Sequence, residues 1–218
     1  MTPQKIVGVI FSAADLARAG RMRRPPDLFE LRLDRLLATP IPLLPAPLII
    51  TARDPREGGA NNLSPARRHA LLLEFLPRAK YLDVELRSTR ALEPVLRAAA
   101  RNKIATIISF HDFDRTPSAA RLDEIASRSR SLGAAIVKVA TRTDTRAQLD
   151  RLLGFFERQR RAADVVAMGI GKLGRASRLE LARRGCLLNY THLGSPAASG
   201  QLSIRDLRRF ADRSDAVS

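Results

Sequence analysis

Short apolar runs alternate along the chain with longer amphipathic stretches. The runs are rich in β-branched residues and have the length of strands, whereas the stretches between them repeat apolar residues at helical spacing. This alternation is typical of repeated βα units. Eight strands are predicted, at residues 5–10, 28–33, 48–53, 81–86, 104–110, 135–140, 164–169 and 186–190. Seven helices are predicted, at residues 13–19, 65–76, 92–101, 119–132, 146–160, 178–184 and 204–213.

The segment between the second and third predicted strands has a different composition. Pro40, Pro42, Pro45 and Pro47 fall within it, and this density of proline leaves no room for an ordinary helix. Eight strands with mostly helical crossovers nevertheless account for nearly all of the 218 residues. The pattern predicts an α/β protein with one domain over residues 1–218, a (β/α)8 TIM barrel, and a doubly wound open sheet is the alternative.

Charged side chains interrupt several predicted strands near their carboxyl ends. Because strand side chains alternate between two faces, these residues share the face opposite to their apolar neighbours. In a barrel that face points into the mouth, where active sites lie, whereas an open sheet would bury the charges beneath helices. For any single strand, a structural ion pair is the alternative interpretation. The charged residues that share this face near the carboxyl ends of the predicted strands are Glu30, Arg32, Asp34, Arg53, Asp83, Glu85 and His111.

Lys138 stands at the centre of the apolar run at residues 135–140. Lysine is rarely buried without partners, and desolvation lowers the pKa of a lysine toward the neutral amine that attacks a carbonyl. A lysine that reaches water or pairs with a carboxylate is the alternative. Because polar groups end so many neighbouring strands, we interpret Lys138 as a candidate nucleophile.

Histidine and cysteine are too few to indicate a metal centre. His69 falls in a predicted helix and His192 in a late loop, so no histidine pair has the spacing of metal ligands. The strand-end carboxylates could hold a hard cation, but the arginines among them would repel it. GxxxxGK[ST] does not occur, and the stretch GIGKLG at residues 169–174 has the GxGxxG spacing but is a short turn with too little pattern to count as a phosphate cradle. We therefore predict a site without metal or cofactor.

The net charge of +16 does not by itself indicate a nucleic-acid-binding protein. Only five of the 38 basic residues are lysine, and the arginines are scattered, with pairs such as Arg67-Arg68 expected on solvated helix faces. Aromatic residues make up 5% of the chain, which is a poor basis for stacking bases. We predict no nucleic-acid partner.

The sequence also predicts where the protein works. No apolar stretch is long enough to span a membrane, and the amino terminus lacks a signal-peptide pattern. Cys186 is the single cysteine, so no internal disulfide can form, which fits a reducing compartment. We expect a cytoplasmic protein with no membrane partner.

Short motifs in a fixed order resemble the type I 3-dehydroquinate dehydratases, and the resemblance covers nearly the whole chain. The motifs are ELRLD at 30–34, TAR at 51–53 with EGG at 57–59, DVEL at 83–86, SFHDF at 109–113 with TP at 116–117, VKVA at 137–140, MG at 168–169, SRL at 177–179 and GQL at 200–202. Each motif alone is weak, but their order is highly specific.

The resemblance implies a (β/α)8 lyase of the shikimate pathway, commonly a homodimer, that dehydrates 3-dehydroquinate to 3-dehydroshikimate without metal or cofactor. It leaves both a biosynthetic and a degradative direction open. By the resemblance, Lys138 forms an imine (Schiff base), His111 is the general base and acid, and Glu85 orients His111. The implied contacts to this small carboxylate substrate are Glu30, Arg32, Arg53, Arg178 and Gln201.

One departure from the family pattern lies just before Gln201. Ala197 stands where the family often has a serine, and Ser199 is a candidate to replace that contact. Two other functions stay open on the residues alone. A class I aldolase would use the same lysine chemistry, and a basic, non-catalytic binding protein could share the scaffold.

Overall fold

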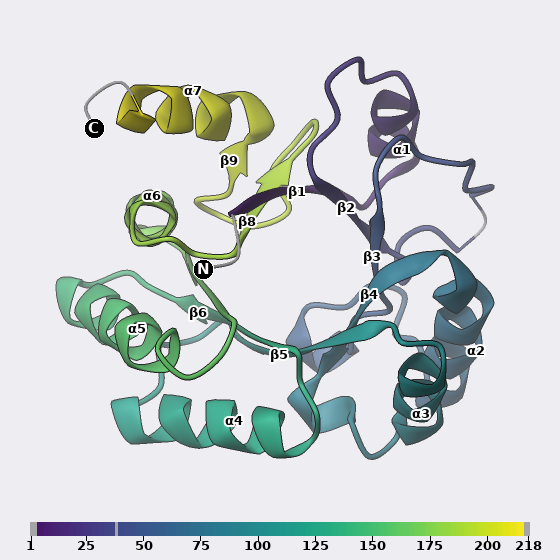
Figure 1. The fold of residues 1–218 in the computed structure, drawn as a ribbon, viewed down its shortest axis with the longest axis horizontal. Coiled ribbons are helices and arrows are strands. Elements are labelled where there is room, and N and C mark those ends of the chain that lie inside the picture. Colours follow the sequence, from purple (N-terminus) through teal and green to yellow (C-terminus); the bar gives the residue numbers. More distant parts are fainter. Residues whose placement is uncertain (1–3, 38, 216–218) are drawn as a thin grey trace.

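The computed structural model describes residues 4–37 and 39–215. Its strands are β1 (Lys5–Ile10), β2 (Leu28–Arg32), β3 (Leu48–Thr51), β4 (Ala79–Glu85), β5 (Ala105–Asp112), β6 (Ile136–Arg142), β7 (Val165–Ile170), β8 (Leu188–His192) and β9 (Leu202–Ser203). They pair in parallel in the order β7-β6-β5-β4-β3-β2-β1-β8-β9 and curl into a ring (Figure 1). The predicted (β/α)8 barrel is confirmed, and the open-sheet alternative is wrong because the strand order never reverses.

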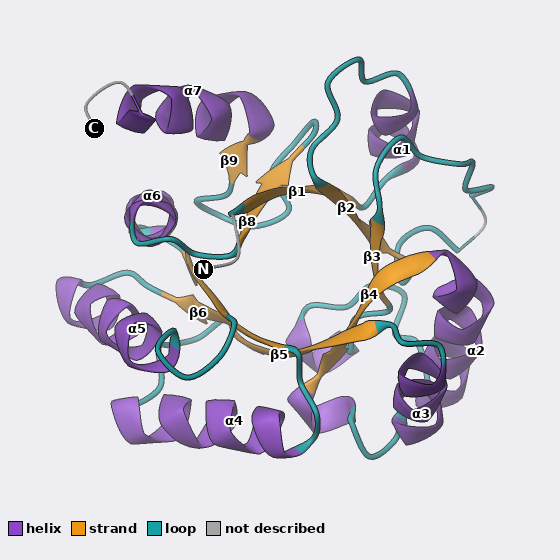
Figure 2. Cartoon of the chain, viewed as in Figure 1, coloured by secondary structure: helices purple, strands orange, loops and turns teal. Residues whose placement is uncertain are grey.

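Helices cover the outside of this ring (Figure 2). They are α1 (Ala13–Gly20), α2 (Pro65–Phe75), α3 (Glu93–Arg101), α4 (Ala119–Ser131), α5 (Arg146–Gln159), α6 (Gly174–Arg183) and α7 (Ile204–Asp215). All seven predicted helices are present, and none is assigned to the described residues between β2 and β3, where the prolines lie. No helix in the described part of the chain is long and apolar enough to cross a lipid bilayer.

Helix α6 begins four residues before its predicted start at Arg178. Gly171 and Gly174 obscure this boundary in the sequence, because glycine is a poor helix former. Gly174 is needed for space, since a Cβ there would lie 2.9 Å from the carbonyl oxygen of Ser199. The close approach brings the segment before β9 against the first turn of α6.

Apolar side chains fill the space between the strands and the outer helices. In α5, for example, Leu152, Phe155 and Phe156 are at most 1% exposed and belong to a cluster that includes Val166 of β7. Burying an aliphatic or aromatic side chain of this size contributes about 1.5–3 kcal/mol to folding. This packing holds the strands, and therefore the side chains at their carboxyl ends, in fixed positions.

The sheet has one seam that strand pairing does not close. Within the described residues, no ladder of hydrogen bonds joins β7 to β8. Arg178 of α6 reaches into this gap, where its Nε donates to the Gly169 carbonyl at 3.2 Å and its Nη1 to the Tyr190 carbonyl at 3.3 Å. A guanidinium therefore bridges the two strands at the carboxyl end of the barrel.

Candidate active site

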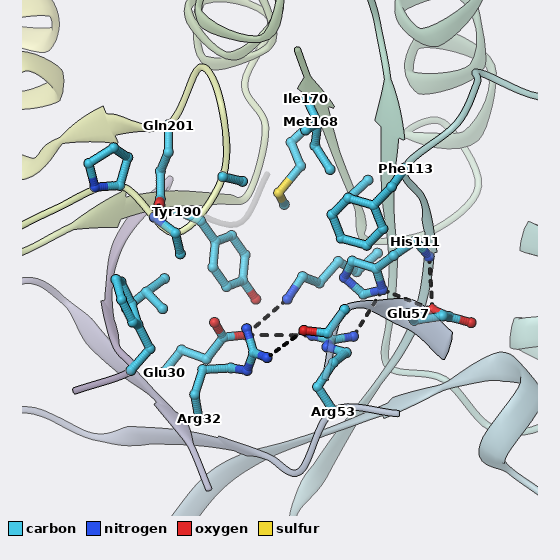
Figure 3. A pocket seen from close by; sticks show the side chains of 18 of the residues that line it. Glu30, Arg32, Arg53, Glu57, His111, Phe113, Met168, Ile170, Tyr190 and Gln201 are labelled. Carbon is cyan, nitrogen blue, oxygen red and sulfur yellow. Dashed lines mark hydrogen bonds and ion pairs between the residues drawn. The ribbon is translucent and has the colours of Figure 1, made fainter. Parts of the chain in front are cut away.

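A cavity of about 450 Å³ opens at the carboxyl ends of the barrel strands (Figure 3). Seven of the eight site residues predicted from the sequence line it, whereas Glu85 does not. The strands β2, β5 and β6 supply four of them, and helix α6 and the segment before β9 supply two more. The seven are Glu30, Arg32, Arg53, His111, Lys138, Arg178 and Gln201.

Lys138 lies in the interior of the barrel, with its side chain 3% exposed. Its Nζ donates to Glu30 Oε1 at 3.0 Å and to Asp83 Oδ2 at 2.8 Å. The nitrogen also lies 4.0 Å from the centre of the Tyr190 ring, a cation–π contact. The carboxylate pairing considered for Lys138 is therefore present, and the same side chain lines the cavity.

Asp83 and Arg53 form the charged floor around Lys138. Burial opposes the charge on Asp83, but Lys138 and Arg53 outweigh it and lower the pKa of this carboxyl below its usual value. Ser109 Oγ also donates to Asp83 Oδ1 at 2.6 Å. Burial likewise opposes the charge on Arg53, yet the carboxylates around it raise its pKa. The floor is thus a buried network whose charges compensate one another.

His111 extends from the end of β5 and contacts two side chains through one ring nitrogen. Its Nδ1 lies 2.9 Å from Arg53 Nη1 and 3.0 Å from Glu57 Oε2. Burial, followed by the charges of Arg53 and Lys138, lowers the pKa of His111 well below 6.5. The imidazole is neutral at pH 7 and can act as a proton acceptor.

Glu57 ends a single 3-10 turn, η1 (Pro55–Glu57), that follows β3. Its Oε2 accepts a hydrogen bond from the backbone N–H of His111 at 2.9 Å as well as lying next to the ring. Burial raises the pKa of Glu57 to about 8, with a further contribution from the nearby charge of Glu85, while Arg53 opposes the shift. The two members of this pair are thus shifted in opposite directions, with the neutral form favoured in both His111 and Glu57.

The predicted contact between Glu85 and His111 is wrong. Glu85 accepts hydrogen bonds from Arg68 Nη2 and from the backbone N–H of Asp54, the latter at 3.1 Å. In the described residues no hydrogen bond or ion pair joins it to His111. The cations give the reason, because Arg68 and Arg53 both engage the Glu85 carboxylate, with Arg53 Nη1 lying 3.4 Å from its Oε1.

Arg68 also corrects an expectation, since it is not on a solvated helix face. Its side chain is 2% exposed and forms ion pairs with Glu85 and with Asp54, the latter at 3.0 Å. A buried guanidinium requires such partners, because an unpaired charge in the interior is costly. Arg68 on one side and Arg53 on the other therefore hold the Glu85 carboxylate, with Arg53 Nη1 at 3.4 Å.

Sequence reasoning missed the role of Glu57, although the motif at residues 57–59 was noticed. Gly58 has a φ of 82°, and a Cβ on Gly59 would lie 2.1 Å from the Arg53 carbonyl oxygen. Only glycine fits both positions, so the chain turns back sharply after Glu57. The signal was the pair of glycines, which reverses the chain beside His111.

Arg178 differs from the other buried arginines because no carboxylate faces it within the described part of the chain. It is 8% exposed, and burial lowers its pKa to about 10. Its contacts are to the two backbone carbonyls of the seam, and it lines the cavity. A buried cation of this kind favours an anionic ligand.

The remaining predicted contacts lie at the rim. Arg32 forms a two-point ion pair with Asp34, with nitrogen–oxygen distances of 2.9 and 2.8 Å. Gln201 Oε1 accepts from the backbone N–H of Ala197 at 2.7 Å, and both residues line the cavity. Ser199 does not line it; its carbonyl oxygen accepts from the backbone N–H of Gly171 at 3.3 Å, so the suggested replacement by Ser199 is not supported.

Over residues 4–37 and 39–215, no group of three or more histidine, cysteine, aspartate or glutamate side chains is placed to hold a metal ion. The cavity brings together an amine, an imidazole, arginines and carboxylates, among them Glu30 and Glu57.

Comparisons with known proteins identify the family to which the chain is similar. A family model described as type I 3-dehydroquinase matches residues 12–215. The 3-dehydroquinate dehydratase of Thermococcus gammatolerans is 34% identical over 210 residues, which cover 94% of this chain and 96% of that protein. The enzyme of the same name from Pyrococcus abyssi is 33% identical over 187 residues, covering 84% and 85%. The solved 3-dehydroquinate dehydratase of Geobacillus kaustophilus has a TM-score of 0.86 at 25% identity, covering 100% of this chain and 93% of that one.

Proposed function

This chain belongs to the type I 3-dehydroquinase family and is an enzyme of that type, and from this premise we propose that it dehydrates 3-dehydroquinate through an imine on Lys138. The observation that carries the mechanism is a buried lysine that lines a cavity together with a neutral imidazole. An imine-forming amine and a proton acceptor are the two groups that such a dehydration requires.

In the first step, Lys138 Nζ gives one proton to the ketone oxygen of the substrate and, as a neutral amine, adds to the ketone carbon. The carbonyl oxygen leaves as water, carrying two of the three hydrogens of the ammonium, and the nitrogen keeps one as the protonated imine. Glu30 and Asp83 hold Nζ at the floor of the cavity before this step. A protonated imine withdraws electrons more strongly than a ketone, so the hydrogen on the adjacent carbon becomes more acidic.

His111 then removes that hydrogen and later returns a proton to the departing hydroxide. Its low pKa makes the neutral ring the resting form, as a general base requires. For Nε2 to accept the proton, the ring hydrogen must be on Nδ1 and be donated to Glu57. This tautomer excludes a hydrogen bond from Arg53 Nη1 to Nδ1, so that contact must be released when His111 acts as the base. We therefore assign to Glu57 the positioning role that the sequence had suggested for Glu85.

Arg178 is proposed to bind the substrate carboxylate. It is a buried cation without a carboxylate partner in the described structure, and a guanidinium matches a carboxylate in a two-point contact. Pro196, Ala197 and Ala198 line the same cavity, so the segment at residues 193–201 is proposed as a lid, with Gln201 as a closing contact. We assign the contacts with the hydroxyl groups of the substrate to Glu30, Arg32 and Arg53.

We also propose that the enzyme works in the cytoplasm as a homodimer. Support for the compartment is the single cysteine, Cys186, which is buried and unpaired. Support for the dimer is the resemblance to the family. Size-exclusion chromatography with light scattering should give twice the chain mass of 24.0 kDa, and a monomer at micromolar concentration would contradict it.

The activity is tested by ultraviolet absorbance. On incubation with 3-dehydroquinate, the protein should generate the absorbance of a conjugated enone, and mass spectrometry should find a product lighter by one water. The Lys138→Ala protein is the control and should give neither. An aldolase would instead release two smaller carbonyl compounds without an enone, and that result would overturn the proposed function.

A further inference from the structure

Tyr190 carries a buried hydroxyl that nothing in the described structure satisfies. The residue is 5% exposed in the middle of β8, and its Oη has no hydrogen-bond partner among the residues described. A buried hydroxyl without a partner typically costs about 1–3 kcal/mol. In Figure 3 the ring points its hydroxyl toward the end of the cavity that holds Glu30 and away from Gln201 at the rim. Such a group calls for an explanation from function.

The hydrogen bonds of Lys138 change when its nitrogen becomes an imine. The ammonium has three hydrogens, and two of its hydrogen bonds go to Glu30 and Asp83. Because the protonated imine of the proposed function keeps a single hydrogen, one of the two buried carboxylates must lose its donor. An unsatisfied buried carboxylate would raise the energy of the covalent intermediate.

Glu30 is the carboxylate that depends more on Lys138. Asp83 keeps the hydroxyl of Ser109 at 2.6 Å and Arg53 Nη2 at 3.4 Å. The side chain of Glu30 accepts its only hydrogen bond within the described residues from Lys138, and its nearest arginine nitrogen is 3.9 Å away. Formation of the imine therefore leaves Glu30 in need of another donor.

We infer that Tyr190 is a positioning residue whose hydroxyl donates to Glu30 once Lys138 has become an imine, and so stabilises the covalent intermediate. This inference rests on the proposed function. Glu30 has two oxygens, so a donor on the side of Lys138 leaves the other oxygen for substrate. Burial, followed by the charges of Glu30 and Asp83, raises the pKa of Tyr190 well above 10, so the phenol stays protonated and able to donate.

The Tyr190 hydroxyl thus has no acceptor in the resting enzyme and gains one, Glu30, in the covalent intermediate. Removing it should have opposite effects on stability and on catalysis. The Tyr190→Phe protein keeps the ring beneath Lys138 and loses only the hydroxyl, so its Tm should equal or exceed that of the parent. A hydrogen bond to a charged acceptor is worth enough that kcat should fall about tenfold or more.

The experiment measures kcat, KM, Tm and the amount of adduct that borohydride traps on Lys138 at saturating 3-dehydroquinate. For Tyr190→Phe we expect a lower kcat and less trapped adduct per folded protein, with KM within about threefold of the parent. Tyr81→Phe is the matched control, because Tyr81 is the only other tyrosine and does not line the cavity. All four quantities should be unchanged in it.

Three outcomes would overturn the role of Tyr190. A kcat within threefold of the parent would remove any function for the hydroxyl. A lower kcat with undiminished trapping would place its effect after the imine, and a raised KM with unchanged kcat would make it an ordinary substrate contact. If the parent itself forms no adduct on Lys138, the proposed function fails instead, so the two failures are distinguishable.

Discussion

Replacing Glu57 by glutamine removes the carboxylate beside His111 and keeps its shape. The pKa of Glu57 is about 8 instead of 4.5, because burial and the charge of Glu85 disfavour its ionised form. A tenfold change in acidity corresponds to about 1.4 kcal/mol, so the ionised form is disfavoured by about 5 kcal/mol relative to an exposed glutamate. Ionised Glu57 is the form that can accept a hydrogen from Nδ1 and free Nε2 as a base.

The base-competent form of the parent enzyme therefore increases as the pH rises through about 8. In the Glu57→Gln enzyme only His111 titrates, and its pKa lies well below 6.5. In the pH profile of kcat/KM, the midpoint of the acidic limb should shift to lower pH by more than one unit. The plateau value of kcat/KM should fall by a factor of about 10², because the imidazole is no longer oriented. Enone absorbance measured at successive values from pH 5 to pH 9 gives both quantities.

Glu85→Gln provides the comparison. Loss of the Glu85 charge lowers the pKa of Glu57 and shifts the limb in the same direction, but the plateau of the folded enzyme should stay near that of the parent. Stability should fall instead, since Arg68 loses one of its two buried carboxylate partners and keeps only Asp54; breaking a buried ion pair typically costs up to about 3–5 kcal/mol, or about 10 °C in Tm. Two results would refute the role of Glu57 in positioning His111. One is an acidic limb of kcat/KM that stays near pH 8 in the Glu57→Gln enzyme, and the other is an equal loss of the plateau rate in the two variants.

Three further predictions follow from the same geometry. Burial lowers the pKa of Arg178 from 12.5 to about 10, a penalty of about 3 kcal/mol that a bound carboxylate would offset. Arg178→Ala should therefore lower kcat/KM by a factor of about 10², and Arg178→Lys should lower it less. A change in kcat/KM within threefold would contradict carboxylate binding. His111→Ala should lose about 10² to 10⁴ in kcat while still accumulating an adduct that borohydride traps, and a folded variant with near-parental turnover would exclude His111 as the base. Labelled duplex DNA should bind weakly and dissociate by about 0.2 M salt, because scattered arginines attract phosphates without reading bases; tight binding at that salt would favour a nucleic-acid function.

The barrel could be predicted because its signals are local. Period-two alternation at the ends of strands such as β2 and β5 places Glu30 and His111 on the inner face, and parallel strands in sequence order bring these ends together. Lys138 could be predicted as a site residue for the same reason, since a charged side chain within an apolar strand must either face the barrel interior or pair with a buried partner. Seven of the eight predicted residues line one cavity, and of these Arg178 and Gln201 were implied only by the family resemblance and not by strand alternation.

The partner of His111 could not be predicted in the same way, because it depends on which cation reaches which carboxylate. Arg68 comes from α2 and holds Glu85, a contact between segments that no spacing in the sequence reveals. Glu57 reaches the histidine through a turn whose geometry depends on two glycines. The orphan hydroxyl of Tyr190 also has no sequence signal, since only the packed barrel shows that it lacks a partner.

The central claim is that Lys138 forms a covalent imine with the substrate, and reduction tests it most directly. Borohydride added to the enzyme in the presence of 3-dehydroquinate should convert the imine to a stable amine and inactivate the protein. Intact mass followed by peptide mapping should place one substrate-derived adduct on the peptide that contains Lys138, and the Lys138→Ala protein should remain unmodified. No adduct on the parent enzyme, or an adduct on another of its five lysines, would contradict the account.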